Sequence, residues 1–215
     1  MYQEKVIASR EGVKEQLADR ETAIAMLLKS IPGEDASREG LVETPHRVAM
    51  MYEEIFGGYE MDPKAILAKT FDSGKMPDDL SEEDIDIYTN GIVIVKDIPF
   101  YSHCEHHMVP FFGHAHIAYV PGQRVVGLSK LARLVECYAK RLQIQERLTN
   151  QVAEAIKEVL QPKGVMVVIQ AEHLCMAMRG VKKPGANTVT SSVSGVFASN
   201  GDARAEVLSL ININK

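Results

Sequence analysis

The chain has few cysteines, no long apolar run and no excess of basic residues, and each shortage excludes a class of protein. Only three of its 215 residues are cysteine, an odd number without a disulfide-like spacing, which favours a reducing compartment and thiols that serve a metal. No apolar run approaches the roughly 18 residues of a membrane span. The first residues, such as Gln3 and Glu4, are polar and give no sign of a signal peptide. We therefore expect a cytoplasmic protein with no membrane partner.

The charge balance also limits the partners of the chain. Lys and Arg number 24 against 29 Asp and Glu, which gives a formal net charge of −5 at pH 7. A general nucleic-acid binder would usually show an overall basic face, so we expect no nucleic-acid partner. Any anionic ligand must then be held by a local basic cluster. A hydrophobic content of 46% is ample for one packed domain, alone or with an N-terminal helical appendage.

The N-terminal part of the sequence is helical in pattern. Apolar residues recur with helical spacing over 20–31. Thr44 as N-cap and Pro45 in the first turn predict a second helix that ends near Gly57-Gly58. The polar, turn-rich stretch 72–84 predicts a loop. We divide the chain into an N-terminal helical segment (1–71), a linker and loop (72–90) and a catalytic domain (91–215).

The remaining sequence mixes strands and helices. Strands are predicted around 91–98 and 113–120, and again at 165–175 and 187–197. Between these two pairs the pattern predicts two helices, the first opened by Ser129 as its N-cap. Two strand pairs that flank a helical pair indicate an α+β protein.

The most informative motif is Cys104-Glu-His-His107, together with His173-Leu-Cys175 far downstream. Zinc is bound tetrahedrally by thiolate and imidazole, and two intervening residues is the usual spacing for two ligands on one turn. Three protein ligands leave a fourth position open, which is typical of a catalytic zinc site and not of a structural one. The alternative is that these thiols are small hydrophobic core residues. Period-2 alternation predicts His173 and Cys175 on one strand face, one as a ligand and the other toward the substrate.

Several motifs occur in a fixed order that carries a family resemblance. They are Thr44-Pro-His-Arg-Val-Ala49, Cys104-Glu-His-His107 with Pro110-Phe111, His116-Ile-Ala-Tyr-Val-Pro121, Gly127-Leu-Ser-Lys130, Gln143-Ile-Gln-Glu-Arg-Leu148, His173-Leu-Cys175, Arg179-Gly180 and Thr188-Val-Thr-Ser191. From about residue 20 to the C-terminus the chain resembles GTP cyclohydrolase I. Any single piece would be weak, but the ordered set is specific.

The resemblance implies a reaction, a fold and an assembly. GTP and water would give 7,8-dihydroneopterin triphosphate and formate, the first step of folate or tetrahydrobiopterin synthesis. The fold would be the tunnelling fold (T-fold), assembled into a ring-shaped homodecamer whose active sites are shared between subunits. Opening the guanine imidazole ring needs an activated water and a proton donor, which a zinc ion beside a histidine can supply.

The resemblance also assigns roles to residues of this chain. Zinc ligands would be Cys104, His107 and Cys175, and the residues that act on GTP would be His106, His173 and Ser129. The alternative for each histidine is a residue that only orients a ligand. The substrate would be bound by Glu146 and Gln145 at the base, and by Lys130, Arg133, Arg179 and Arg47, which suit a triphosphate. Glu146 could instead be a helix-start carboxylate, and any one of the Arg residues could be a solvated surface residue.

Two other functions are alternatives to this one. A zinc deaminase would carry Cys-x-x-Cys, which this sequence lacks. The other is a non-catalytic, zinc-stabilised nucleotide-binding module, and it remains the alternative. Such a module should have four protein ligands that complete the zinc site and no basic cluster for a triphosphate. Cys137 is expected in the core, and His114 and His116 are expected not to bind metal. Hydroxyls along one face of the last strand, from Thr188 on, are expected to be structural.

Overall fold

The computed structural model describes residues 2–72 and 91–212, with side chains from residue 15 onward. The chain divides into two units, Met1–Gly57 and Gly58–Lys215. The loop predicted at 72–84 lies, from residue 73 on, outside the described residues. No helix within the described ranges is long and apolar enough to cross a membrane.

The first unit is helical. It consists of α1 (Tyr2–Ser30), α2 (Glu39–Val42) and α3 (Thr44–Ile55). An ion pair joins α1 to α3, with Arg20 Nη2 2.6 Å from Glu53 Oε1. Pro45 lies in the first turn of α3 as predicted, but Thr44 is a helical residue and Glu43 is the N-cap. The Thr44 hydroxyl donates back to the Gly40 carbonyl at 3.3 Å, so it is not free to cap α3.

The second unit is built on a five-stranded sheet with the order β5-β2-β3-β6-β7. All neighbours pair antiparallel except β5, which runs parallel to β2. A separate two-stranded sheet joins β1 to β4. The strands are β1 (Thr70–Asp72), β2 (Val93–Cys104), β3 (Pro110–Val120), β4 (Arg124–Val126), β5 (Leu142–Gln143), β6 (Gly164–His173) and β7 (Asn187–Gly195).

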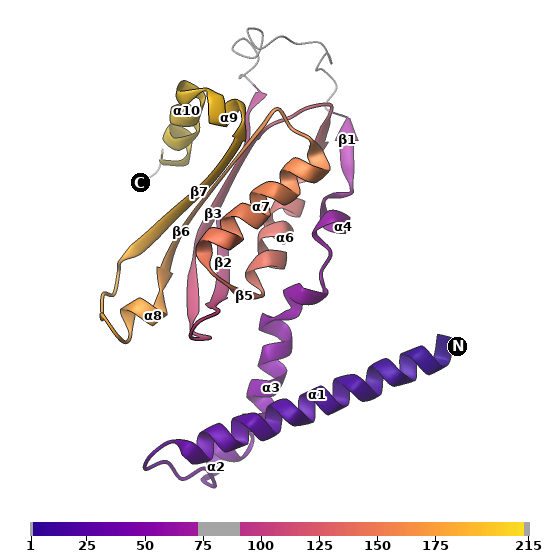
Figure 1. The fold of residues 1–215 in the computed structure, drawn as a ribbon, viewed down its shortest axis with the longest axis vertical. Helices are drawn as coiled ribbons and strands as arrows, with labels where there is room; N and C mark the ends of the chain where they lie inside the picture. Colours follow the sequence, from indigo (N-terminus) through magenta and orange to yellow (C-terminus); the bar gives the residue numbers. More distant parts are fainter. Residues whose placement is uncertain (1, 73–90, 213–215) are drawn as a thin grey trace. The chain divides into compact units, whose positions relative to one another are not determined.

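Helices cover both faces of this sheet (Figure 1). On one face α6 (Leu128–Ala139) and α7 (Gln145–Leu160) enclose the main core, which contains Ile117 and Val167. On the other face α9 (Val196–Ser199) and α10 (Gly201–Asn212) pack over Ala118 and Val168. Alternate residues of the same strands therefore serve the two cores, as the pleat requires. The remaining elements are η1 (Gly57–Glu60), α4 (Pro63–Leu67) and α8 (Leu174–Ala177).

The predicted α+β class, with an antiparallel sheet and a helical pair, is confirmed. Besides the N-cap of α3, two local predictions were wrong. The first strands are longer than expected, because a bulge between Val95 and Ile98 lets β2 continue to Cys104. Ser129 is the second residue of α6, and Gly127, in extended backbone, is its N-cap. The pattern of apolar residues locates the helix but does not fix its first residue.

Candidate active site

The three predicted metal ligands meet at one end of the sheet. The ligand atoms of Cys104, His107 and Cys175 all lie within 4.8 Å of one another. Cys104 ends β2, and the turn that follows is closed by Met108, whose backbone N–H donates to the Cys104 carbonyl at 2.7 Å. This turn brings His107 Nδ1 to 3.6 Å from Cys104 Sγ. The two residues between Cys104 and His107 therefore place both ligands on one turn, as the sequence predicted.

Cys175 reaches the cluster by a different route from the one the sequence predicted. Strand β6 ends at His173, and Cys175 lies in the short helix α8. The prediction that His173 and Cys175 alternate along one strand face was therefore wrong. The chain turns after His173, with the Met178 N–H donating to the Leu174 carbonyl at 3.0 Å. The helical turn directs Cys175 to Cys104, while His173 stays on the sheet.

The donor set suits a zinc ion. Two sulfurs and one imidazole nitrogen are ligands that zinc prefers to the oxygen ligands of magnesium or calcium. Burial raises the pKa of the Cys175 thiol, and the nearby Cys104 raises it further. A divalent cation would reverse this effect, because it stabilises both thiolates. The residues present therefore fit the metal.

The two histidines assigned to catalysis have different surroundings. His106 is largely exposed, and its Nδ1 lies 3.8 Å from Cys104 Sγ. The ring of His173 is half-buried and stacks on Phe111, with 4.6 Å between centroids and an interplanar angle of 0°. Its Nε2 lies 2.8 Å from Gln145 Oε1. Burial lowers the pKa of His173, and the charge of Glu146 partly opposes that shift.

Sequence reasoning missed an ion pair beside the metal ligands. Arg147 holds both carboxylate oxygens of Glu105, with Nη1–Oε2 at 2.5 Å and Nη2–Oε1 at 3.0 Å. This pair keeps the pKa of the Glu105 carboxyl below its usual value. It ties the turn after Cys104 to the first turns of α7. The sequence holds a signal, since Glu105 stands inside the ligand motif, but a partner 42 residues away is not visible in one sequence.

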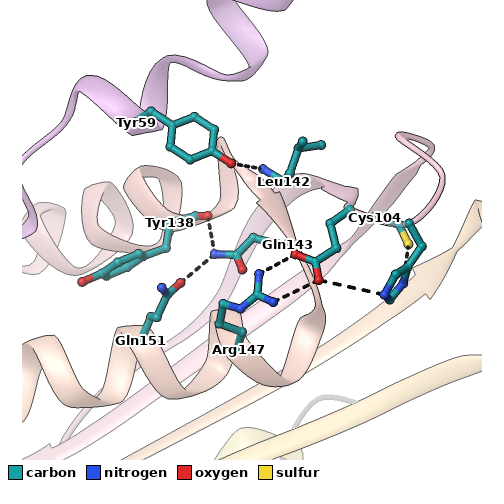
Figure 2. Close-up of polar contacts among 9 residues, drawn as sticks. Tyr59, Cys104, Tyr138, Leu142, Gln143, Arg147 and Gln151 are labelled. Carbon is teal, nitrogen blue, oxygen red and sulfur yellow. Dashed lines mark hydrogen bonds and ion pairs between the residues drawn. The ribbon is translucent and has the colours of Figure 1, made fainter.

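A second set of contacts holds the short strand β5 against this turn (Figure 2). The Glu105 N–H donates to the Gln143 carbonyl at 2.9 Å. The Gln143 amide donates in turn to the Tyr138 carbonyl and to Gln151 Oε1, at 3.0 and 2.7 Å. Tyr59 accepts the N–H of the residue before Gln143 at 3.1 Å. The metal-ligand turn is therefore anchored on its outer side by side chains that do not touch the cluster.

Of the residues predicted to bind substrate, Gln145 is buried, Lys130 is half-buried and the rest are exposed. Arg179 and Glu146 lie close enough to Cys175 and His173, respectively, to affect their pKa values. The others lie earlier in the chain: Lys130 and Arg133 on α6, beside the predicted catalytic Ser129, and Arg47 on α3 of the first unit. Arg133 lines a cavity of about 400 Å³ between α6 and β2, together with Glu136, Lys140 and Tyr101.

Two of the residues expected not to bind metal are buried. Cys137 is fully buried, and burial raises the pKa of its thiol. His116 is buried and its Nδ1 accepts the Asp97 N–H at 3.1 Å. Among the described residues the cluster of Cys104, His107 and Cys175 is the one group able to hold a metal.

Fold and site together define an α+β protein with a candidate zinc centre of two thiols and one imidazole. The family model for GTP cyclohydrolase I matches residues 20–212. The chain belongs to the GTP cyclohydrolase I family, as the ordered motifs indicated.

The chain is similar to curated relatives over most of their length. The chain is 57% identical to "GTP cyclohydrolase 1" of Halalkalibacterium halodurans over 190 residues, which cover 88% of this chain and 93% of the relative. It is 56% identical to the protein of the same name from Geobacillus kaustophilus, over 90% of this chain and 96% of the relative. A solved structure of the archaeosine synthase QueF-Like in the apo form matches with a TM-score of 0.40 and 20% identity, over 49% of this chain and 94% of that chain.

Proposed function

We propose that the chain is a zinc-dependent GTP cyclohydrolase I, which converts GTP and water to 7,8-dihydroneopterin triphosphate and formate. This is the first step of folate and tetrahydrobiopterin biosynthesis. Relatives 53–57% identical bear that enzyme's name. The structural observation that supports the proposal best is the meeting of Cys104, His107 and Cys175 within 4.8 Å, although 68 positions of sequence separate the last two (175 − 107).

Zinc would be held by these three residues. When bound, it supplies Lewis-acid activation of the water that attacks C8 of guanine. The two cysteines contribute the charge that retains the ion, and the turn closed by Met108 fixes the geometry of Cys104 and His107. Glu105, bound to Arg147, would keep this turn in place while the substrate enters.

His173 and His106 would exchange protons with the substrate. Because burial lowers the pKa of His173, its ring is neutral at pH 7 and can accept a proton. The Phe111 ring limits its rotation by stacking. His106 is more exposed and lies on the ligand turn itself. Ser129 would act at the ribose when its ring opens.

The substrate would be selected at the base and retained at the triphosphate. A carboxylate at Glu146 can accept both N1–H and the exocyclic amine of guanine, which adenine does not offer. The phosphates would be bound by Lys130, Arg133, Arg179 and Arg47, in an otherwise acidic chain. The resemblance places Gln145 at the base with Glu146, but the Gln145 side chain is buried.

We further propose that the enzyme is a homodecamer with active sites shared between subunits. Within one chain, no described interaction joins Lys130 or Arg133 to the metal ligands. Strand β7 is an edge of the sheet and exposes Val189, at 62%. Edges are removed when strands of neighbouring subunits join. Light scattering on a size-exclusion column should give a mass near ten times 23.8 kDa; a fully active monomer would contradict the shared site.

The function is tested by incubating the metal-loaded protein with GTP and, separately, with ATP. GTP should yield formate and a fluorescent pterin after oxidation, and ATP should yield neither. GTP binding without formate would indicate the alternative, a zinc-stabilised nucleotide-binding module. Equal turnover of ATP would contradict the role given to Glu146.

A further inference from the structure

The side chain of Gln145 is buried, and both ends of its amide are hydrogen-bonded within the protein. The residue is 1% exposed at the start of α7. Its amide nitrogen lies 3.0 Å from the Ile169 carbonyl, 3.0 Å from the Thr188 carbonyl and 3.1 Å from Thr190 Oγ1. Its amide oxygen lies 2.8 Å from His173 Nε2. The side chain thus connects α7 with β6, β7 and the His173 ring.

The direction of each hydrogen bond in this group follows from its neighbours. The Thr149 hydroxyl donates to the Gln145 backbone carbonyl at 2.8 Å. The Thr190 hydroxyl, 2.7 Å from Thr149 Oγ1, must therefore donate its own hydrogen to Thr149. All three neighbours of the Gln145 amide nitrogen are then acceptors. A flipped amide would place an oxygen against two carbonyl oxygens, so the orientation of the Gln145 amide is fixed.

A fixed amide also fixes the hydrogen on the imidazole. Because Gln145 Oε1 is an acceptor, His173 Nε2 must carry the hydrogen. In the neutral ring the lone pair is then on Nδ1. Stacking on Phe111 holds the ring plane while the hydrogen bond holds the rotation within that plane.

We propose that Gln145 is a positioning residue, which holds His173 as the Nε2–H tautomer so that Nδ1 is the nitrogen that exchanges a proton with the substrate. The proposal rests on the proposed function in one respect, since it takes His173 to be the proton-transfer group. It differs from a direct contact between Gln145 and guanine. A direct contact would need the amide to be accessible, whereas the side chain is 1% exposed and its nitrogen already faces three acceptors within the chain.

The first test is the tautomer itself, in the wild-type oligomer. Magic-angle-spinning NMR of sedimented protein labelled with ¹⁵N-histidine distinguishes a protonated from an unprotonated ring nitrogen, and His173→Asn identifies the signal by its loss. We expect neutral His173 with hydrogen on Nε2 and none on Nδ1. Hydrogen on Nδ1 in the wild type would overturn the proposal. This readout needs no GTP, so it stands even if the protein releases no formate, which would defeat the proposed function alone.

The second test is Gln145→Met, with Thr190→Val as the matched control. Gln145→Met keeps the volume but removes the acceptor of His173 Nε2, so the His173 signal should show mixed tautomers. Loss of a hydrogen bond that orients a metal-bound histidine typically costs 10- to 100-fold in activity; on that scale we expect kcat to fall by at least about 10-fold with KM changed less than about 3-fold. Thr190→Val removes one acceptor of the same amide and should keep the wild-type tautomer and kcat.

Zinc content and circular dichroism check that both variants fold. A Gln145→Met protein that keeps kcat and the Nε2–H tautomer but raises KM would return Gln145 to a substrate contact. Equal losses of kcat in the two variants would show that the effect comes from general loosening of the α7–β7 contact. If Gln145→Met does not fold, the wild-type tautomer still decides the proposal.

Discussion

Replacing Phe111 by leucine tests two roles of this residue, which are packing in the core and holding the His173 ring in place. Phe111 is fully buried, stacks on His173 at 4.6 Å and meets Phe100 edge-on at 6.0 Å. Leucine fills part of the same space and causes no clash. It cannot present a flat face to the imidazole, so the ring gains freedom to tilt.

The size of the stability loss can be worked from these contacts. Leucine has about three fewer side-chain carbons, at about 0.8 kcal/mol for each buried carbon. Each of the two ring contacts of Phe111 adds roughly 0.5–1.5 kcal/mol. Partial repacking lowers the total, and we expect a loss of about 3 kcal/mol in the free energy of unfolding. For a chain of this size that corresponds to a fall in Tm of roughly 6–12 °C, measured by thermal denaturation at one protein concentration.

The matched control is Phe197→Leu. Phe197 is also fully buried, but it lies in the core on the other face of the sheet, beside α10. Phe197→Leu removes the same three carbons, about 2.4 kcal/mol before repacking, so its Tm should also fall, by somewhat less than that of Phe111→Leu. Steady-state assays at 25 °C should show kcat reduced about 10-fold in Phe111→Leu and nearly unchanged in Phe197→Leu, with KM similar in both. Equal kcat in the two variants would refute the claim that Phe111 positions His173.

Three further changes probe the site. Cys175→Ala should remove zinc and turnover together by metal analysis, whereas Cys137→Ala keeps both. In the zinc-free protein a thiol reagent at pH 8 should modify Cys175 faster than Cys137; the pKa of both thiols is raised, but Cys175 is only partly buried and Cys137 is fully buried. A Cys175→Ala protein with full zinc would exclude that ligand. Glu146→Gln should weaken GTP binding at unchanged zinc content, and unchanged affinity in a titration would make it a helix-start carboxylate. Arg147→Met should release Glu105 and lower zinc affinity about 10-fold in a competition with a chelator, and an unchanged affinity would show that the ion pair does not hold the ligand turn.

The sequence predicted the parts of the site that depend on short spacing. Cys104 and His107 are three positions apart on one turn, and the structure brings Cys175 to the same place. The α+β class followed from the order of apolar patterns. These features are local, or are repeated often enough along the chain to be read from one sequence.

The features that the sequence did not predict depend on long-range contacts. After His173 the chain turns instead of continuing as a strand, and the turn brings Cys175 to Cys104. The alternation of side chains along a strand does not predict where the strand ends. The pairing of Glu105 with Arg147 and of Gln145 with His173 joins α7 to the turn after β2 and to the end of β6. Single residues such as Ser129 are placed by helix starts, which patterns locate only within a few positions.

One zinc ion held by Cys104, His107 and Cys175 is expected to support the release of formate from GTP. The most direct measurement is reconstitution of chelator-treated protein with increasing zinc while formate release is followed. Activity should be negligible without metal, rise in proportion to added zinc and level off at about one zinc per chain. Full formate release by protein shown to be free of metal, or a plateau that persists when Cys175 is replaced by alanine, would contradict the claim.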